Sequence, residues 1–234
     1  MGRHIVIIGG IGPQSSLELH RRLIDRAAAL GAREVSAYPR ISHFSLPVHD
    51  LTRPGTLEPD PAAIAALAGA AAGVELAADD RVVVACHTAH LLYDGIVRTL
   101  GHPVESLVAA AVGATVVTGA RRVGLLASPA TIASDLYGAP LRAAGREVIL
   151  PGPDAIDRLE KVIVDLCANR PPAEAVPEVA ALVTDLVDAG AERVLLGCTE
   201  LSLLATHLDP ARTVDPLAAV VERLLPAPTV GGQR

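Results

Sequence analysis

Two segments of this chain resemble each other and decide its fold: DRVVVACHTAHLL at residues 80–92 and ERVLLGCTELSLL at residues 192–204. Each has an acid and an arginine, then a short apolar run typical of a buried strand, then a cysteine, Cys86 or Cys198, before a turn into a predicted helix. A second pair, RHIVIIGG at residues 3–10 and RRVGLLAS at residues 121–128, lies at nearly the same separation. We therefore expect two related halves, although unrelated strand-to-helix turns in any α/β protein would also look alike.

Short β-branched runs alternate along the chain with Ala/Leu-rich segments of helical length, which predicts an α/β fold with mainly parallel sheets. We expect two pseudo-symmetric α/β domains, each a sheet flanked by helices, with the active site in the cleft between them. The first domain is predicted to hold residues 1–104 and 211–234, and the second residues 105–210. The clearest strands are expected at residues 5–8, 82–85, 123–126 and 194–196, and the clearest helices at 15–30 and 173–190.

Composition narrows the classes of function. The formal net charge is -6, basic residues are scattered, and aromatic residues make up only 2% of the chain, so binding of nucleic acid is not expected. No apolar run reaches the roughly 18 residues of a membrane span, and the apolar run at the start is too short for a signal peptide. We expect a cytoplasmic protein without a membrane segment, whose three cysteines form no disulfide framework.

Cys86 and Cys198 are expected at the carboxyl ends of two strands, where open α/β sheets bind ligands. If the halves are related by an approximate two-fold axis, the two thiols face each other. Inverting a carbon next to a carboxylate needs one base on each face, one as thiolate and the other as thiol. Amides at a helix amino terminus would lower the pKa of each thiol. The only lysine, Lys161, lies in a helical pattern, so nothing calls for pyridoxal phosphate.

Several motifs together carry a family resemblance: GGIGP at residues 9–13, CHTAH at 86–90, LLASPAT at 125–131, GCTEL at 197–201 and VDP at 214–216. On these motifs the chain resembles the aspartate/glutamate racemase superfamily, nearest its aspartate racemase-like branch. The resemblance covers almost the whole chain. It implies two pseudo-symmetric α/β domains and racemisation of a small amino acid without a cofactor or metal. We also expect a homodimer.

Carried onto this sequence, the resemblance implies that Cys86 and Cys198 are the acid/base pair. It implies that the residues around the substrate carboxylates are Thr88, Ser128, Thr131 and Thr199, and that Ile11 and Gly12 line the floor of the site. Two positions depart from the family pattern. His87 stands where Asn is usual. Arg53 is expected to bind substrate by standing in, one position displaced, for an Arg-Thr pair that reads the side-chain carboxylate in aspartate racemases.

His87 is titratable near neutral pH, so we expect it to titrate together with Cys86 and to influence the choice of substrate. It also motivates an alternative: another activity of the superfamily on a small carboxylic acid, either maleate-type cis-trans isomerisation or malonate-type decarboxylation. A binding module that senses a small acid without turning it over is a third hypothesis. Both thiols are present, which argues against such a module.

Other residues have ordinary explanations. Cys167 is expected to be a buried packing residue inside a helix. Glu200 is either a general acid or an acid in the first turn of a helix, where the helix dipole favours it. Arg158 and Lys161 are interpreted as exposed helix charges.

A zinc site and a dinucleotide-binding fingerprint, which are typical of other protein classes, are both incomplete in this sequence. His87 and His90 share a helical face with Cys86, but no further ligands recur at zinc spacing. The glycine-rich start has Ser15 where a dinucleotide fingerprint needs its third glycine.

Overall fold

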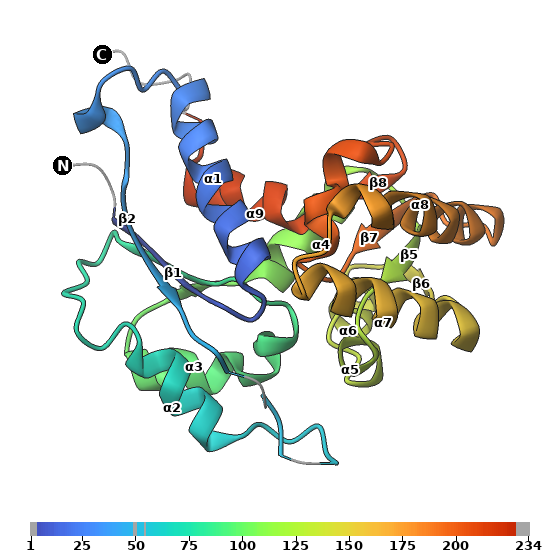
Figure 1. The fold of residues 1–234 in the computed structure, drawn as a ribbon, viewed down its shortest axis with the longest axis horizontal. Coiled ribbons are helices and arrows are strands. Elements are labelled where there is room, and N and C mark those ends of the chain that lie inside the picture. The colour runs from blue at the N-terminus through green and yellow to red at the C-terminus, as the bar shows by residue number, and fades with distance from the viewer. Residues whose placement is uncertain (1–3, 49–50, 54, 228–234) are drawn as a thin grey trace.

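A computed structural model describes residues 4–48, 51–53 and 55–227 of the chain (Figure 1). It contains two four-stranded sheets in which all strands run parallel. The first sheet has the order β2 (Arg40–Ser45), β1 (His4–Gly9), β3 (Arg81–Val84) and β4 (Val104–Glu105). The second has the order β6 (Glu147–Ile149), β5 (Arg122–Leu126), β7 (Arg193–Leu196) and β8 (Thr213–Val214).

The two sheets have the same strand order, so the predicted repeat is present in the structure. In each sheet the strand of the second sequence echo, β1 or β5, lies beside the strand that precedes a cysteine, β3 or β7. Residues of these strands are almost all buried, since helices cover both faces of each sheet. The predicted two-domain α/β fold is thereby confirmed.

Nine α-helices and three 3₁₀-helices connect the strands in the described part of the chain. Their bounds are α1 (Pro13–Ala29), η1 (Val35–Ala37), α2 (Pro61–Gly69), η2 (Thr88–Leu92), α3 (Tyr93–Leu100), α4 (Leu107–Val117), α5 (Pro129–Ala133), α6 (Gly138–Ala143), α7 (Pro153–Cys167), α8 (Pro172–Asp188), η3 (Leu201–His207) and α9 (Pro216–Leu224). The helices predicted at residues 15–30 and 173–190 correspond to α1 and α8. Gly31 and Gly190 follow these helices with φ of 102° and 103°, a conformation that glycine adopts without strain.

Alternate residues of each strand point to opposite faces, and each face has its own apolar cluster. In the first sheet, Ile5 and Ile7 pack under α1, α4 and α9, while Val6 and Ile8 pack under α2 and α3. In the second sheet, one face is covered by α4 and α6 and the other by α7, α8 and η3. The core is therefore built in layers from aliphatic side chains.

Helix α4 belongs to both halves. Leu107 and Ala110 pack in the first half, whereas Val108 and Ala111 pack in the second, so the helix lies between the two sheets. A helix that is apolar on two sides has no single apolar stripe. This explains why residues 105–118 show only a weak pattern in the sequence.

The segment expected in the first domain, residues 211–234, contacts both halves in its described part, residues 211–227. Within it, β8 pairs with β7 and so lies in the second sheet. It is α9 that returns to the first half, packing against α1 and α4 (Figure 1). Within the described residues, no helix combines the length and apolar character needed to cross a membrane.

Candidate active site

The two cysteines occupy equivalent places in the two halves. Cys86 lies two residues after β3 ends and Cys198 lies two residues after β7 ends. Both are buried, with 7% and 8% of their surfaces exposed. The predicted helices that follow the two cysteines are the 3₁₀-helices η2 and η3.

The ionisation of both thiols differs from the prediction. Burial raises the pKa of Cys86 to about 12, and the charge of Glu200 adds to this rise. Backbone N–H groups of Ala89 and Thr88 hydrogen-bond the sulfur and oppose it. Burial also raises the pKa of Cys198 well above its usual range, with smaller contributions from Glu200 and from the charge of Cys86. The predicted lowering of the thiol pKa values is wrong, because desolvation outweighs the amides.

Glu200 is the residue of this site that the sequence analysis did not assign. The residue is buried, with 4% of its surface exposed. One oxygen accepts hydrogen bonds from the Gly12 N–H at 3.3 Å and the Ser15 hydroxyl at 2.9 Å. The other oxygen accepts from the Cys198 thiol at 3.0 Å and the Thr199 hydroxyl at 3.1 Å. Glu200 thus links Gly12 and Ser15 of the first half to Cys198, the candidate base of the second half.

Three of the predicted binding residues form a hydroxyl cluster, which consists of Thr88, Ser128 and Thr131. The Thr88 hydroxyl lies 3.2 Å from that of Ser128 and 3.1 Å from that of Thr131, and Ser128 and Thr131 are 3.0 Å apart. Thr88 comes from the first half and the other two from the second. Ser128 also caps α5 by accepting from the Thr131 N–H. The structure therefore brings these three residues together beside the turn that holds Cys86.

His87 is buried between the halves with 1% of its surface exposed. Its Nδ1 is hydrogen-bonded to the hydroxyl of Tyr137, a fully buried residue of the second half. Its Nε2 is buried and has no hydrogen-bond partner among the described residues. Burial lowers the pKa of His87 to about 3. The expectation that His87 titrates near neutral pH beside Cys86 is therefore wrong.

Gly12 is held close to the carboxylate of Glu200. A Cβ added at Gly12 would lie 2.8 Å from Glu200 Oε1, which no real Cβ tolerates without a shift. Ile11 is partly buried and packs against the apolar cluster of the first half. Thr199, predicted to bind substrate, donates its hydroxyl to Glu200.

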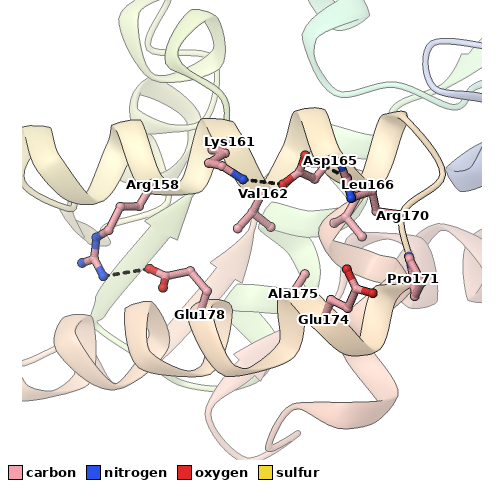
Figure 2. Close-up of a pocket in the computed structure, with 10 residues that line it drawn as sticks. All are labelled: Arg158, Lys161, Val162, Asp165, Leu166, Arg170, Pro171, Glu174, Ala175 and Glu178. Atoms are coloured by element: carbon pink, nitrogen blue, oxygen red, sulfur yellow. Dashed lines mark hydrogen bonds and ion pairs between the residues drawn. The ribbon is translucent and has the colours of Figure 1, made fainter.

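Arg53, expected to bind substrate, and the helix charges Arg158 and Lys161 are each paired with an acid. Arg53 is exposed and its guanidinium hydrogen-bonds Glu58 at 3.3 Å. Arg158 donates to Glu178 and Lys161 to Asp165, along a groove between α7 and α8 with a cavity of about 310 Å³ (Figure 2). That cavity is lined by residues of α7, α8 and the turn between them, and neither Cys86 nor Cys198 is among them. The interpretation of Arg158 and Lys161 as exposed helix charges is confirmed.

Cys167 differs from its prediction. It was expected to be a buried packing residue, but it is exposed at the last position of α7. Its sulfur lies 3.4 Å from the place that a Cβ of Gly12 would take, close to Glu200. Although the residue as a whole is exposed, partial burial of its sulfur and the charge of Glu200 raise the pKa of this thiol to about 12. The end of α7 thus brings a third thiol to the surroundings of Glu200.

Comparison with known proteins identifies the family of the chain. Residues 8–224 match the family model described as Asp/Glu/Hydantoin racemase. The chain belongs to this family. The superfamily resemblance stated on the sequence motifs is therefore confirmed.

Individual relatives differ in how much of them is matched. A glutamate racemase from Roseiflexus sp. (strain RS-1) is 34% identical over 157 residues, which are 61% of this chain and 54% of that protein. The chain thus spans about half the length of the glutamate racemases it matches. A broad specificity amino-acid racemase from Bacillus subtilis (strain 168) is 26% identical over 209 residues, covering 87% of this chain and 88% of that protein.

Solved structures share the fold. The Picrophilus torridus aspartate racemase superimposes with a TM-score of 0.77 at 20% identity, covering 96% of this chain and 93% of the other. An aspartate racemase homologue from Pyrococcus horikoshii OT3 gives a TM-score of 0.75 at 24% identity, covering 96% and 98%. At these identities the likeness shows the two-domain α/β fold.

Proposed function

We propose that this protein is an amino-acid racemase that uses Cys86 and Cys198 as its two bases and needs no cofactor. The observation that carries the proposal is the equivalent placement of two buried thiols after β3 and β7 of matching sheets. Family membership supports it, and the relative matched over most of its length bears the name of a broad specificity amino-acid racemase. Acidic amino acids are the substrates that the resemblance implies.

In the proposed reaction, one cysteine as thiolate takes the α-proton from one face of the substrate. The other cysteine as thiol gives its proton to the opposite face, so one C–H bond breaks and one forms without net loss of a proton. The hydrogen bond from Cys198 to Glu200 favours Cys198 as the thiol at the start. Amides of Thr88 and Ala89 favour the charge on Cys86. In the reverse direction the two roles exchange.

The hydroxyl cluster is proposed to hold the substrate α-carboxylate. Three hydroxyls that now hydrogen-bond one another can each donate to a carboxylate oxygen and to the enediolate charge that develops as the α-proton leaves. The substrate ammonium would face the negative charge of Glu200 and of the thiolate. Such a cation lowers the pKa of the buried thiols, which makes a thiolate accessible only when an amino acid is bound.

The test is exchange of the substrate α-hydrogen in heavy water, followed by NMR, together with racemisation followed by polarimetry. Cys86→Ala and Cys198→Ala should each abolish racemisation, whereas Cys167→Ala, which also removes one thiol, should retain it. Undiminished racemisation in both Cys86→Ala and Cys198→Ala would overturn the two-base mechanism.

The substrates in this test separate the alternative activities. Dicarboxylic acids without nitrogen are tested beside L- and D-amino acids, since maleate-type isomerisation and malonate-type decarboxylation need no amino group. Turnover of those acids alone would replace the racemase proposal. Tight binding of an amino acid without any exchange would favour the binding module.

A further inference from the structure

Two buried histidines follow Cys86 in the chain, and they differ in how their ring nitrogens are satisfied. His90 uses both nitrogens: Nδ1 donates to the Cys86 carbonyl at 2.9 Å, and Nε2 accepts from the Leu107 N–H at 3.0 Å. His87 uses only Nδ1, while its Nε2 is buried and has no partner among the described residues. A buried ring nitrogen without a partner costs free energy, which a ligand can recover by supplying that partner.

The hydroxyl of Tyr137 decides which nitrogen of His87 carries the proton. Burial raises the pKa of Tyr137 well above its usual range, so the phenol keeps its proton. Within the described part of the chain, this hydroxyl has His87 Nδ1 as its one hydrogen-bond partner. If Nδ1 carried the ring proton, the phenol O–H and the Nε2 lone pair would both be buried without partners. With Tyr137 donating to Nδ1, only the Nε2–H group is left free.

We propose, resting on the racemase function above, that Tyr137 is a positioning residue that donates to Nδ1 and holds His87 as the neutral Nε2–H tautomer, which donates to a carboxylate oxygen of the substrate. A free N–H group needs an acceptor, so it cannot bind the substrate ammonium, which is itself a donor. A carboxylate is the acceptor that amino acids and nitrogen-free dicarboxylic acids share. The hydroxyl cluster begins at the next residue, Thr88, so both kinds of donor lie on one turn.

The two side chains connect the surroundings of the two candidate bases. His87 directly follows Cys86, whereas Tyr137 lies close enough to Cys198 for the charge of that thiol to add to the rise in the phenol pKa. The rings lie with their centroids 5.5 Å apart, and 1% and 0% of the two residues are exposed. Packing and the hydrogen bond together therefore hold the imidazole in one orientation.

Nitrogen-15 NMR of protein labelled at histidine measures the tautomers directly, because protonated and unprotonated ring nitrogens have different chemical shifts. At neutral pH we expect opposite tautomers for the two histidines, Nδ1–H for His90 and Nε2–H for His87. The signals of His87 are assigned by their loss in His87→Gln. In Tyr137→Phe the Nδ1 signal of His87 should move, since it loses the proton that it accepts. An Nδ1–H form of His87 in the wild type, or an Nδ1 signal unmoved in Tyr137→Phe, would overturn the inference and leave the racemase function intact.

Substrate binding tests whether the free donor is used. Saturation with the amino acid that the wild type exchanges fastest should shift the Nε2–H proton signal of His87 toward that of a charge-assisted hydrogen bond. The Nδ1–H signal of His90, whose bond lies within the protein, should stay in place. An Nε2–H signal that does not move on saturation would refute the contact with the carboxylate.

Exchange of the substrate α-hydrogen tests the positioning role. Tyr137→Phe should lower kcat/KM by about tenfold, the scale of one buried hydrogen bond. The control Tyr93→Phe, which removes a phenol that donates to the Val104 carbonyl, should keep kcat/KM close to the wild-type value. In His87→Gln, whose amide N–H needs no tautomer, Tyr137→Phe should have little further effect.

The outcomes of this cycle separate the inference from the function on which it rests. The same loss from Tyr137→Phe in both backgrounds, or no loss in either, would refute the coupling of Tyr137 to His87 while racemisation stands. Absence of exchange by the wild type with every amino acid would overturn the racemase function and the substrate role of His87 together. The tautomer of His87 is measured by NMR in either case.

Discussion

Acidification should destabilise the fold through the buried His87. In the unfolded chain its pKa is 6.5, and in the folded protein burial lowers the pKa to about 3. Between these values the unfolded state binds a proton that the folded state does not, so the free energy of unfolding falls as pH falls through this window. The slope is about 1.4 kcal/mol per pH unit for one group. From pH 6.5 to about pH 5 this amounts to roughly 2 kcal/mol.

Urea unfolding followed by circular dichroism at several pH values in this window measures the effect. Burial also lowers the pKa of His90, to about 4, and those of His4 and His43, so the wild-type slope is a sum of several groups. His87→Asn isolates one of them, because the other histidines cancel in the difference between variant and wild type. That difference should change with pH by about 1.4 kcal/mol per unit. A difference that stays constant across the window would refute the assignment of a buried, neutral His87.

Three further variants test the contacts around Glu200 and His87. Gly12→Ala should lower the free energy of unfolding, measured by thermal unfolding, by about 1–3 kcal/mol, since its Cβ would overlap Glu200. The control Gly69→Ala, whose Cβ would lie in open space on α2, should not destabilise the fold in that assay. Glu200→Gln should cost about 1–3 kcal/mol in urea unfolding, since an amide cannot accept all four bonds, and an unchanged stability would contradict these bonds. Tyr137→Phe leaves His87 Nδ1 without its buried partner and should cost a similar amount, about 1–3 kcal/mol, while wild-type stability would show that the bond contributes nothing.

The fold could be predicted largely because its information is local. Apolar strands followed by cysteine recur in the sequence, and the structure places them at matching positions of two parallel sheets. The pairing of β8 with β7 could not be predicted, because β8 is only two residues long and leaves no pattern in the sequence. The division into domains at residues 104 and 210 stays a prediction.

The site was predictable in its residue types but not in its electrostatics. Motif positions identified Cys86, Cys198 and the hydroxyl cluster, and the structure brings the cluster together. The amides near the thiols could be inferred from sequence, whereas the depth of burial that raises the pKa of Cys86 could not. Tyr137 left no signal, since its contact with His87 depends on how the halves meet. For Glu200, the sequence did offer a signal: it lies only two residues after Cys198, close enough in the chain to contact that cysteine.

The matching halves differ at one position with a consequence for stereochemistry. Two residues beyond its cysteine, the first half has the hydroxyl of Thr88 and the second has the carboxylate of Glu200. If the halves arose by duplication, this position has diverged into a neutral donor on one side and an anion on the other. An amino acid carries one carboxylate and one ammonium, so such a site would hold both mirror-image forms by the same two groups. Only the hydrogen and the side chain would then need to exchange places, and the scaffold could stay still while handedness changes.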